Sequence, residues 1–118
     1  MYNCIMYSKE LLKGTLKTIV LKLLSEQEKM YGYEITQHVK SATDGKIVLT
    51  EGALYPTLHK LEDDGYVQTE KVTYGGRVRK YYKLTESGNE AATQKVNEFE
   101  EFVQSMKFIF NKNLSTEL

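Results

Sequence analysis

The stretch TEGALYPTLHKLEDDGYVQTEKVTYGGRVRKYYKLTESG, residues 50–88, decides the fold because a short amphipathic helix in it leads directly into a β-hairpin. Thr50 is a predicted N-cap of this helix, and Gly65 is its predicted stop. The leucines between them have the spacing of one buried helix face: Leu54, Leu58 and Leu61. Two β-prone runs follow, at residues 66–72 and 78–84, and a loop at residues 73–77 joins them. A helix followed by such a hairpin is the core of a winged helix-turn-helix.

Pro56 lies inside this predicted helix and should disturb it locally. A proline there removes one backbone hydrogen bond, and its ring crowds the carbonyl group of Gly52, four residues earlier. We therefore expect a bend or a 3₁₀ first turn near Pro56. The leucine spacing and the two end signals still favour a helix.

Two further helices are predicted on the N-terminal side. The first should be capped by Ser8 and run to about Gln27. Its apolar stripe consists of Leu12, Leu16, Ile19, Val20 and Leu23. The second should cover residues 31–42 and bury Ile35 and Val39.

One more strand and one long helix complete the predicted order. Residues 47–49, Ile-Val-Leu, are expected to add a short strand beside the hairpin. The last helix should start after an N-cap at Thr85. The predicted fold class is thus mainly α with a small β-hairpin: a winged helix-turn-helix, with elements in the order helix, helix, strand, helix, strand, strand, followed by a long C-terminal helix.

The length of 118 residues suits one ordinary core, and no linker rich in Pro, Gly or Ser divides the chain. We expect residues 1–84 to form the winged helix-turn-helix domain with an N-terminal extension, and residues 85–118 to form a dimerisation helix in the same compact unit. With 41% hydrophobic and 27% charged residues, the composition is that of a soluble globular protein. Lysines interrupt the apolar run at residues 11–24, so we expect neither a secretory signal nor a membrane span. We therefore expect a cytoplasmic location.

The formal net charge of zero conceals an uneven distribution of charge. Residues 1–65 hold 8 Lys/Arg and 9 Asp/Glu, residues 66–84 hold 5 and 1, and residues 85–118 hold 3 and 6, giving −1, +4 and −3. Positive charge is therefore concentrated in the hairpin, where a wing that contacts phosphates needs it. A solvated charged hairpin without a nucleic-acid partner is the alternative explanation of this charge.

The C-terminal segment carries a heptad seam that predicts a helix pair. Apolar residues recur at intervals of 4, 3, 4, 3 and 4: Ala92, Val96, Phe99, Val103, Met106 and Phe110. A small three-helix core cannot bury such a seam alone, so we expect it, with Leu12, to form the interface of a homodimer. Ile5, Met6 and Tyr7 offer further apolar surface for the same interface. The alternative is a helix folded back wholly onto the first helix of its own chain.

Several short motifs along the chain resemble one known family. The matching residues are Gly14-Thr15-Leu16, Tyr31-Gly32-Tyr33-Glu34-Ile35, Glu51-Gly52-Ala53-Leu54-Tyr55-Pro56 with Leu58, Leu61-Glu62 and Gly65, then Gly75-Gly76-Arg77, Lys80-Tyr81-Tyr82 and Leu84-Thr85-Glu86-Ser87-Gly88. In this order and nearly without gaps, residues 11–90 resemble the PadR-like transcriptional regulators, specifically the short members with a single C-terminal helix. A proline in the third helix, awkward from first principles, is usual in that family.

The resemblance implies a bacterial homodimer that binds a roughly palindromic operator on double-stranded DNA. Such regulators are usually repressors of an adjacent operon, released when a small hydrophobic or aromatic effector binds. In short relatives an aromatic compound sits between the paired C-terminal helices, and Phe99 falls where such a ligand would stack. Plain packing of Phe99 in the seam is the alternative, because the chain has no tryptophan.

Three groups of residues are predicted to contact DNA. On the helix after Thr50, side chains able to reach base edges or phosphates are Glu51, Tyr55, Thr57, His59 and Lys60. On the wing, the residues expected to approach the backbone or a narrow minor groove are Gly75, Gly76, Arg77, Arg79 and Lys80. At the start of the second helix, hydroxyls for phosphate are expected from Tyr31 and Tyr33. Tyr31 could equally be a core aromatic with a solvated tip.

Other functional classes have less support in the sequence. No cofactor or metal site is predicted, since Cys4, His38 and His59 have no supporting spacing and no phosphate-binding glycine loop occurs. The single cysteine also excludes an internal disulfide, which fits a reducing compartment. A winged-helix module that binds protein and not DNA is the main rival, and the charge of the hairpin disfavours it.

Overall fold

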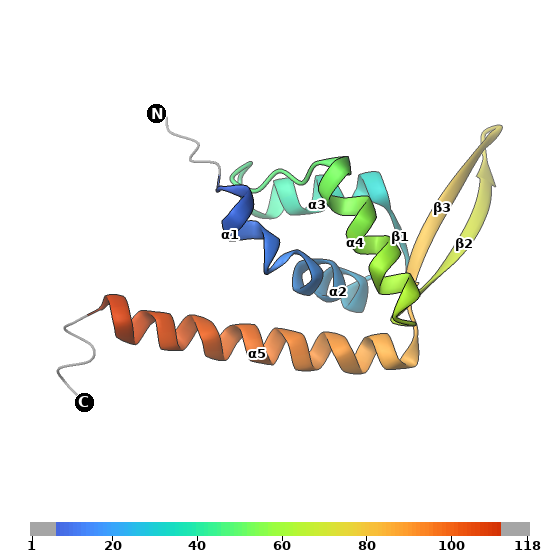
Figure 1. Cartoon of the computed structure of the whole chain (residues 1–118). Coiled ribbons are helices and arrows are strands. Elements are labelled where there is room, and N and C mark those ends of the chain that lie inside the picture. The colour runs from blue at the N-terminus through green and yellow to red at the C-terminus, as the bar shows by residue number, and fades with distance from the viewer. Residues whose placement is uncertain (1–6, 112–118) are drawn as a thin grey trace.

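The computed structural model describes residues 7–111 of the chain. Its elements, in chain order, are α1 (Lys9–Lys13), α2 (Leu16–Glu26), β1 (Met30–Tyr31), α3 (Gly32–Ala42), α4 (Glu51–Asp63), β2 (Val67–Tyr74), β3 (Arg77–Leu84) and α5 (Glu86–Phe110). Figure 1 shows α2, α3 and α4 grouped beside the sheet, the β2–β3 hairpin projecting away from them, and α5 running beneath α2. This arrangement confirms the predicted winged helix-turn-helix with a long C-terminal helix.

The predicted first helix is in fact two helices, α1 and α2, because the helical conformation is interrupted at Gly14 and Thr15. Ser8 caps α1 as expected, since its hydroxyl accepts a hydrogen bond from the Leu11 amide at 3.2 Å. Both the amide and the hydroxyl of Thr15 donate to the Leu12 carbonyl at 3.0 Å, which ends α1. A glycine weakens a helix, and a threonine side chain competes for its backbone, so the apolar spacing alone did not reveal the break.

The expected strand at residues 47–49 is wrong, and the third strand is β1. The sheet has the order β1-β3-β2 and is antiparallel, with Met30 opposite Tyr82 and Tyr31 opposite Tyr81. Ile47 and Leu49 lie in an irregular segment and pack on the core. Their apolar character therefore reflects burial and not strand pairing. The strand precedes α3 in the chain, and its two residues are too few to show a periodicity.

α4 has the predicted start, buried face and end. The Thr50 hydroxyl accepts a hydrogen bond from the Ala53 amide at 3.2 Å, and the three leucines of the predicted face are fully buried. At the other end, Gly65 has a φ of +80°. The Tyr66 amide donates to the Leu61 carbonyl at 2.9 Å, a pattern that closes a helix around a left-handed glycine. The helix is α-helical from Glu51 to Asp63, so the 3₁₀ turn considered for Pro56 does not occur within α4.

The hairpin is longer and its turn tighter than expected. β2 and β3 pair from Val67–Leu84 to Tyr74–Arg77, which leaves a loop of Gly75 and Gly76 in place of the predicted loop at residues 73–77. The two glycines have φ values of +55° and +80°. A two-residue turn with positive φ at both positions matches the right-handed twist of the strands, so the ladder continues to the tip.

The core lies between the three larger N-terminal helices, the base of the sheet and the first turns of α5. The side chains least exposed to solvent are Val20, Leu21, Ile35, Leu54, Leu58, Leu61 and Tyr82. α5 joins this core through Gly88, Ala91 and Ala92, and the rest of the helix is half-buried or exposed. Burial raises the pKa of the Tyr82 phenol, which keeps this ring neutral in the folded chain.

Candidate nucleic-acid interface

The exposed face of α4 carries some of the predicted base-reading residues. Glu51, His59 and Lys60 are exposed, and the Lys60 ammonium lies 3.3 Å from the Asp64 carboxylate. That ion pair is between solvent-exposed groups four residues apart, so it is weak and leaves Lys60 able to exchange partners.

Two other predicted base-reading residues are occupied within the protein. Tyr55 is half-buried, and its ring lies against Gly32 at the start of α3. The Thr57 hydroxyl donates to the Ala53 carbonyl at 3.1 Å, within its own helix. Tyr55 therefore has a packing role between α3 and α4.

Three small or rigid residues on the exposed side of α4 did not figure among the predicted contacts. Gly52, Ala53 and Pro56 are all exposed, and Gly52 has no atom within 4 Å of where a Cβ would stand. Their position follows from the leucine spacing, because they occupy the face opposite to the buried one. Small residues there allow the helix backbone to approach a duplex closely.

The two tyrosines predicted at the start of α3 differ in their exposure to solvent. Tyr33 is 63% exposed. Tyr31 is half-buried and caps the helix, with its amide donating to the Glu34 carboxylate at 3.0 Å. Its ring meets the Tyr81 ring edge-on, with centroids 5.4 Å apart. Tyr31 is thus packed against Tyr81, and a contact of its hydroxyl with phosphate stays a prediction.

The register of the hairpin divides the predicted wing residues between its two faces. Side chains alternate along a strand, so Val78, Lys80 and Tyr82 share the face that meets the core. Arg77 and Arg79 lie on the opposite, outer face. The predicted basic set of Arg77, Arg79 and Lys80 is therefore divided, because Lys80 lies on the inner face, over the Tyr82 ring at 5.6 Å.

Arg79 is engaged by aromatic rings on the outer face. Its guanidinium carbon lies 4.5 Å from the centroid of the Tyr31 ring and 4.8 Å from that of the Tyr74 ring. A hydrogen bond with the Tyr81 side chain raises the pKa of Arg79 above its already high usual value. By contrast, Arg77 is exposed next to the turn, where positive charge can reach a phosphate.

Much of the apolar surface left uncovered lies on α5 and near α1. Of the predicted seam, Ala92 is only 3% exposed and packs in the core of its own chain, so little of its surface is left for a partner. Leu12, Val96, Val103 and Met106 are half-buried, while Phe99 and Phe110 are exposed. The seam prediction omitted four exposed residues: Leu11, Phe102, Phe108 and Ile109. Ile5 and Met6 lie outside the described residues.

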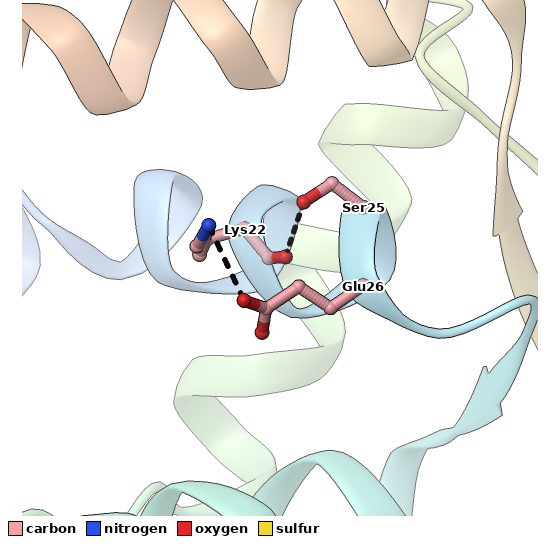
Figure 2. A network of polar contacts seen from close by, with 3 residues as sticks. All are labelled: Lys22, Ser25 and Glu26. Atoms are coloured by element: carbon pink, nitrogen blue, oxygen red, sulfur yellow. Dashed lines mark hydrogen bonds and ion pairs between the residues drawn. The ribbon is translucent and has the colours of Figure 1, made fainter.

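Among the grooves that Phe99 lines, two lie between α5 and other helices of the chain. One, of about 710 Å³, lies between the α1 region and α5, and Phe102 also lines it. The other, of about 580 Å³, lies between α2, α3 and α5. Lys22 and Glu26 line its polar edge, where their 3.2 Å ion pair and the Ser25 bond to the Lys22 carbonyl stay within α2 (Figure 2).

The described part of the chain offers few groups for catalysis or metal binding. His38 and His59 are both exposed and lie on different helices, α3 and α4. Within residues 7–111 no group of three or more His, Cys, Asp or Glu side chains is arranged to hold a metal ion. Over the same range no helix has the length and apolarity needed to cross a membrane.

A three-stranded sheet with a basic two-stranded wing, beside a capped helix with a small-residue outer face, defines a winged-helix protein of the DNA-binding class. Residues 20–94, more than half of the chain, match the sequence model of the transcriptional regulator PadR-like family. The chain belongs to this family of DNA-binding transcriptional regulators, and it is not an enzyme.

Two relatives are similar to this chain in sequence. Protein X of Lysinibacillus sphaericus is 32% identical over 98 residues, which cover 81% of this chain and 88% of that protein. The transcriptional regulator Rv3488 of Mycobacterium tuberculosis is 38% identical over 58 residues, 49% of this chain and 54% of that protein.

Solved structures show the same fold over nearly the whole chain. A transcriptional regulator from Clostridium thermocellum has a TM-score of 0.80 at 30% identity, covering 90% of this chain and 100% of that one. A PadR family regulator from Eggerthella lenta has a TM-score of 0.71 at 29% identity, covering 86% and 87%. The chain is therefore similar to these regulators in its long C-terminal helix as well as in its winged domain.

Proposed function

We propose that this regulator is a cytoplasmic homodimer that represses an adjacent operon and is released from a roughly palindromic operator by a small hydrophobic or aromatic effector. The observation that carries the proposal is the row of exposed apolar side chains on the second half of α5, which includes Phe99, Phe102 and Ile109. Monomeric proteins rarely leave such a row uncovered, and a second copy of the same helix would bury it. Residues 85–110 would then serve as the dimerisation helix of the chain.

In this proposal α4 enters the major groove and the wing reaches the flanking backbone. His59, Lys60 and Glu51 are the exposed side chains of α4 available for base edges, each good contact contributing about 1–3 kcal/mol of discrimination. The turn glycines let the wing tip approach closely, and Arg77 supplies the charge there. Tyr33 would donate its hydroxyl to a phosphate near the start of α3.

Dimerisation would make operator recognition sensitive to geometry. Two copies of α4 must meet two half-sites about one duplex turn apart, so their separation decides the affinity. α5 is joined to the end of α4: the Gly65 carbonyl accepts hydrogen bonds from the Thr85 hydroxyl at 2.7 Å and from the Ser87 hydroxyl at 3.1 Å. A change in the angle between paired α5 helices would therefore move α4.

The effector site would lie beside Phe99, between the two α5 helices. Beside this ring, the grooves of about 710 and 580 Å³ between α5 and the other helices of its own chain have the size of small-molecule pockets and would extend the site. A flat aromatic compound stacked on Phe99 would bind more tightly to one spacing of the helices than another, and that difference would shift the dimer away from its operator-binding form.

The test is a titration of DNA from the region upstream of the chain's own gene, at several salt concentrations, with the wild type and Arg77→Ala. The variant dimer loses one phosphate contact in each subunit, two in all, which should lower the affinity and reduce the salt slope by about 1.8. The matched control is Lys107→Ala, which removes an exposed positive charge from α5 and should leave both quantities unchanged. Absence of binding by the wild type in dilute salt would favour a winged-helix module that recognises protein.

Release by effectors is tested separately on the preformed complex. Planar aromatic compounds are added to the operator complex, and the wild type is compared with Phe99→Ala. Release of the wild type but not of the variant supports the site beside Phe99. Equal release of both proteins places the effector elsewhere.

A further inference from the structure

The outer face of the sheet carries a continuous row of aromatic and charged side chains that runs from the wing tip to the start of α3. Its members are Tyr74, Arg79, Tyr31, Tyr81, Lys29 and Glu70. Neighbours in this row are in contact: Lys29 lies 5.0 Å from the Tyr81 ring and forms a 3.3 Å ion pair with Glu70. The row lies on the face opposite to the core.

We propose that Arg79 is a positioning residue that holds the wing at a set angle to α3, by packing between Tyr31 and Tyr74, and that it is not a phosphate ligand. Tyr31 caps α3, whereas Tyr74 ends β2 beside the turn. Arg79 therefore joins the tip of the hairpin to the body of the domain. The proposal deepens the function proposed above, and only its DNA arm depends on that function.

The outer part of the hairpin needs such a support because its inner face makes little contact with the core. Beyond Tyr82 the inner face leaves the core, and Val78 is 66% exposed. A two-stranded ribbon in water is marginally stable on its own. β1 supports β3 only as far as the Tyr31–Tyr81 pair. Arg79 is the next residue on the same face of β3, so its contacts extend the support by one step toward the tip.

The chemistry of the guanidinium suits this role better than that of an ammonium. A planar, delocalised cation stacks on aromatic rings and sheds water more readily than lysine does. Tyr74 is 64% exposed, and the Arg79 guanidinium lies within 5 Å of both its ring centroid and that of Tyr31. Arg77 pairs with Tyr74 next to the turn, and its charge is the one presented to solvent at the wing tip.

The first experiment uses the free full-length protein and needs no DNA. Backbone NMR relaxation of Gly75 and Gly76 reports the fast motion of the wing tip, and the Arg79 side-chain protons should show upfield ring-current shifts. Arg79→Ala and Tyr74→Ala should increase tip motion, and Tyr74→Ala should abolish part of the shift. Tyr74→Phe keeps the ring and should behave as the wild type. Arg77→Ala is the control for loss of a wing charge and should leave tip motion unchanged.

The second experiment measures operator binding against salt. Arg79→Ala should lower the affinity severalfold with an unchanged salt slope, whereas Arg77→Ala should reduce the slope by about 1.8, the value for one lost phosphate contact in each subunit of the dimer. Arg79→Lys should recover only part of the affinity. A reduced slope for Arg79→Ala with unaltered tip motion would overturn the proposal and make Arg79 a phosphate ligand. Unaltered tip motion in Tyr74→Ala would also overturn it. Failure of the wild type to bind DNA would refute the proposed function, while the relaxation data would still decide the role of Arg79.

Discussion

The backbone of Gly88 lies directly against the carbonyl group of Tyr66, so closely that a Cβ on residue 88 would overlap it. This contact joins the first turn of α5 to the residue before β2. The Thr85 amide reinforces it by donating to the same Tyr66 carbonyl at 3.0 Å. The direction of α5 is therefore set where α4, the wing and α5 meet.

Gly88→Ala should destabilise the chain because the added methyl group has no room. Overpacking of this kind costs about 1–3 kcal/mol, measured as a fall in the free energy of unfolding in urea. Gly52→Ala is the matched control, since a Cβ there meets nothing within 4 Å and alanine favours a helix. Equal stabilities of the two variants would show that the joint at Tyr66 tolerates displacement.

Gly32 and Tyr55 should be energetically coupled across α3 and α4. A Cβ on residue 32 would overlap the Tyr55 ring, so Gly32→Ala should lower the free energy of unfolding. Tyr55→Leu shortens the side chain and should restore part of the loss in the double variant, with a coupling of about 0.5–3 kcal/mol in a double-mutant cycle. Strictly additive effects would contradict the contact.

The wing turn should discriminate between residues that accept positive φ and those that do not. Gly76→Ala places a Cβ in the left-handed region and should cost about 1–2 kcal/mol. Gly75→Asn should cost less, because asparagine is common in two-residue turns of this type. Thermal unfolding of both variants, beside Gly14→Ala where φ is −77°, measures the difference. A cost for Gly14→Ala as large as that for Gly76→Ala would argue against backbone strain.

Self-association should depend on the exposed apolar residues of α5. Phe102→Lys should shift the chain toward monomer in sedimentation velocity, because a charge would be buried without a partner in the paired helices. Val78→Ser is the control, since it removes an exposed apolar side chain from the wing. Unchanged association of Phe102→Lys would remove this face from the interface.

Alkaline pH should destabilise the fold in part through Tyr82. Burial raises the pKa of this phenol above its usual 10.0, so the unfolded chain loses the proton first as the pH rises. The contribution is fully present below about pH 10 and is lost as the pH rises from there through the folded-state pKa. Tyr82→Phe should therefore show a shallower fall in the free energy of unfolding above about pH 10. An identical fall in both proteins would contradict the assignment.

Predictions that rest on neighbours in the chain agree well with the structure. Thr50, the three leucines and Gly65 determine α4 because caps and helix periodicity act over a few residues. The same is true of the Ser8 and Thr85 caps. At Gly14 and Thr15 a local signal competes with periodicity, and the prediction of one continuous helix was wrong there. Apolar spacing indicates which face of a helix is buried, but it does not indicate whether the helix is continuous.

Contacts between distant segments were beyond the reach of the sequence. The sequence by itself determined a winged helix with a basic hairpin and an uncovered apolar C-terminal helix, because hydrophobic spacing, caps and turn residues are local properties. Only the tertiary structure decided that Met30 and Tyr31 form the third strand, that Tyr55 packs on Gly32, and that Arg79 lies between two tyrosines. These depend on strand register, where a shift of one residue exchanges the two faces of the sheet, and no local pattern specifies that register.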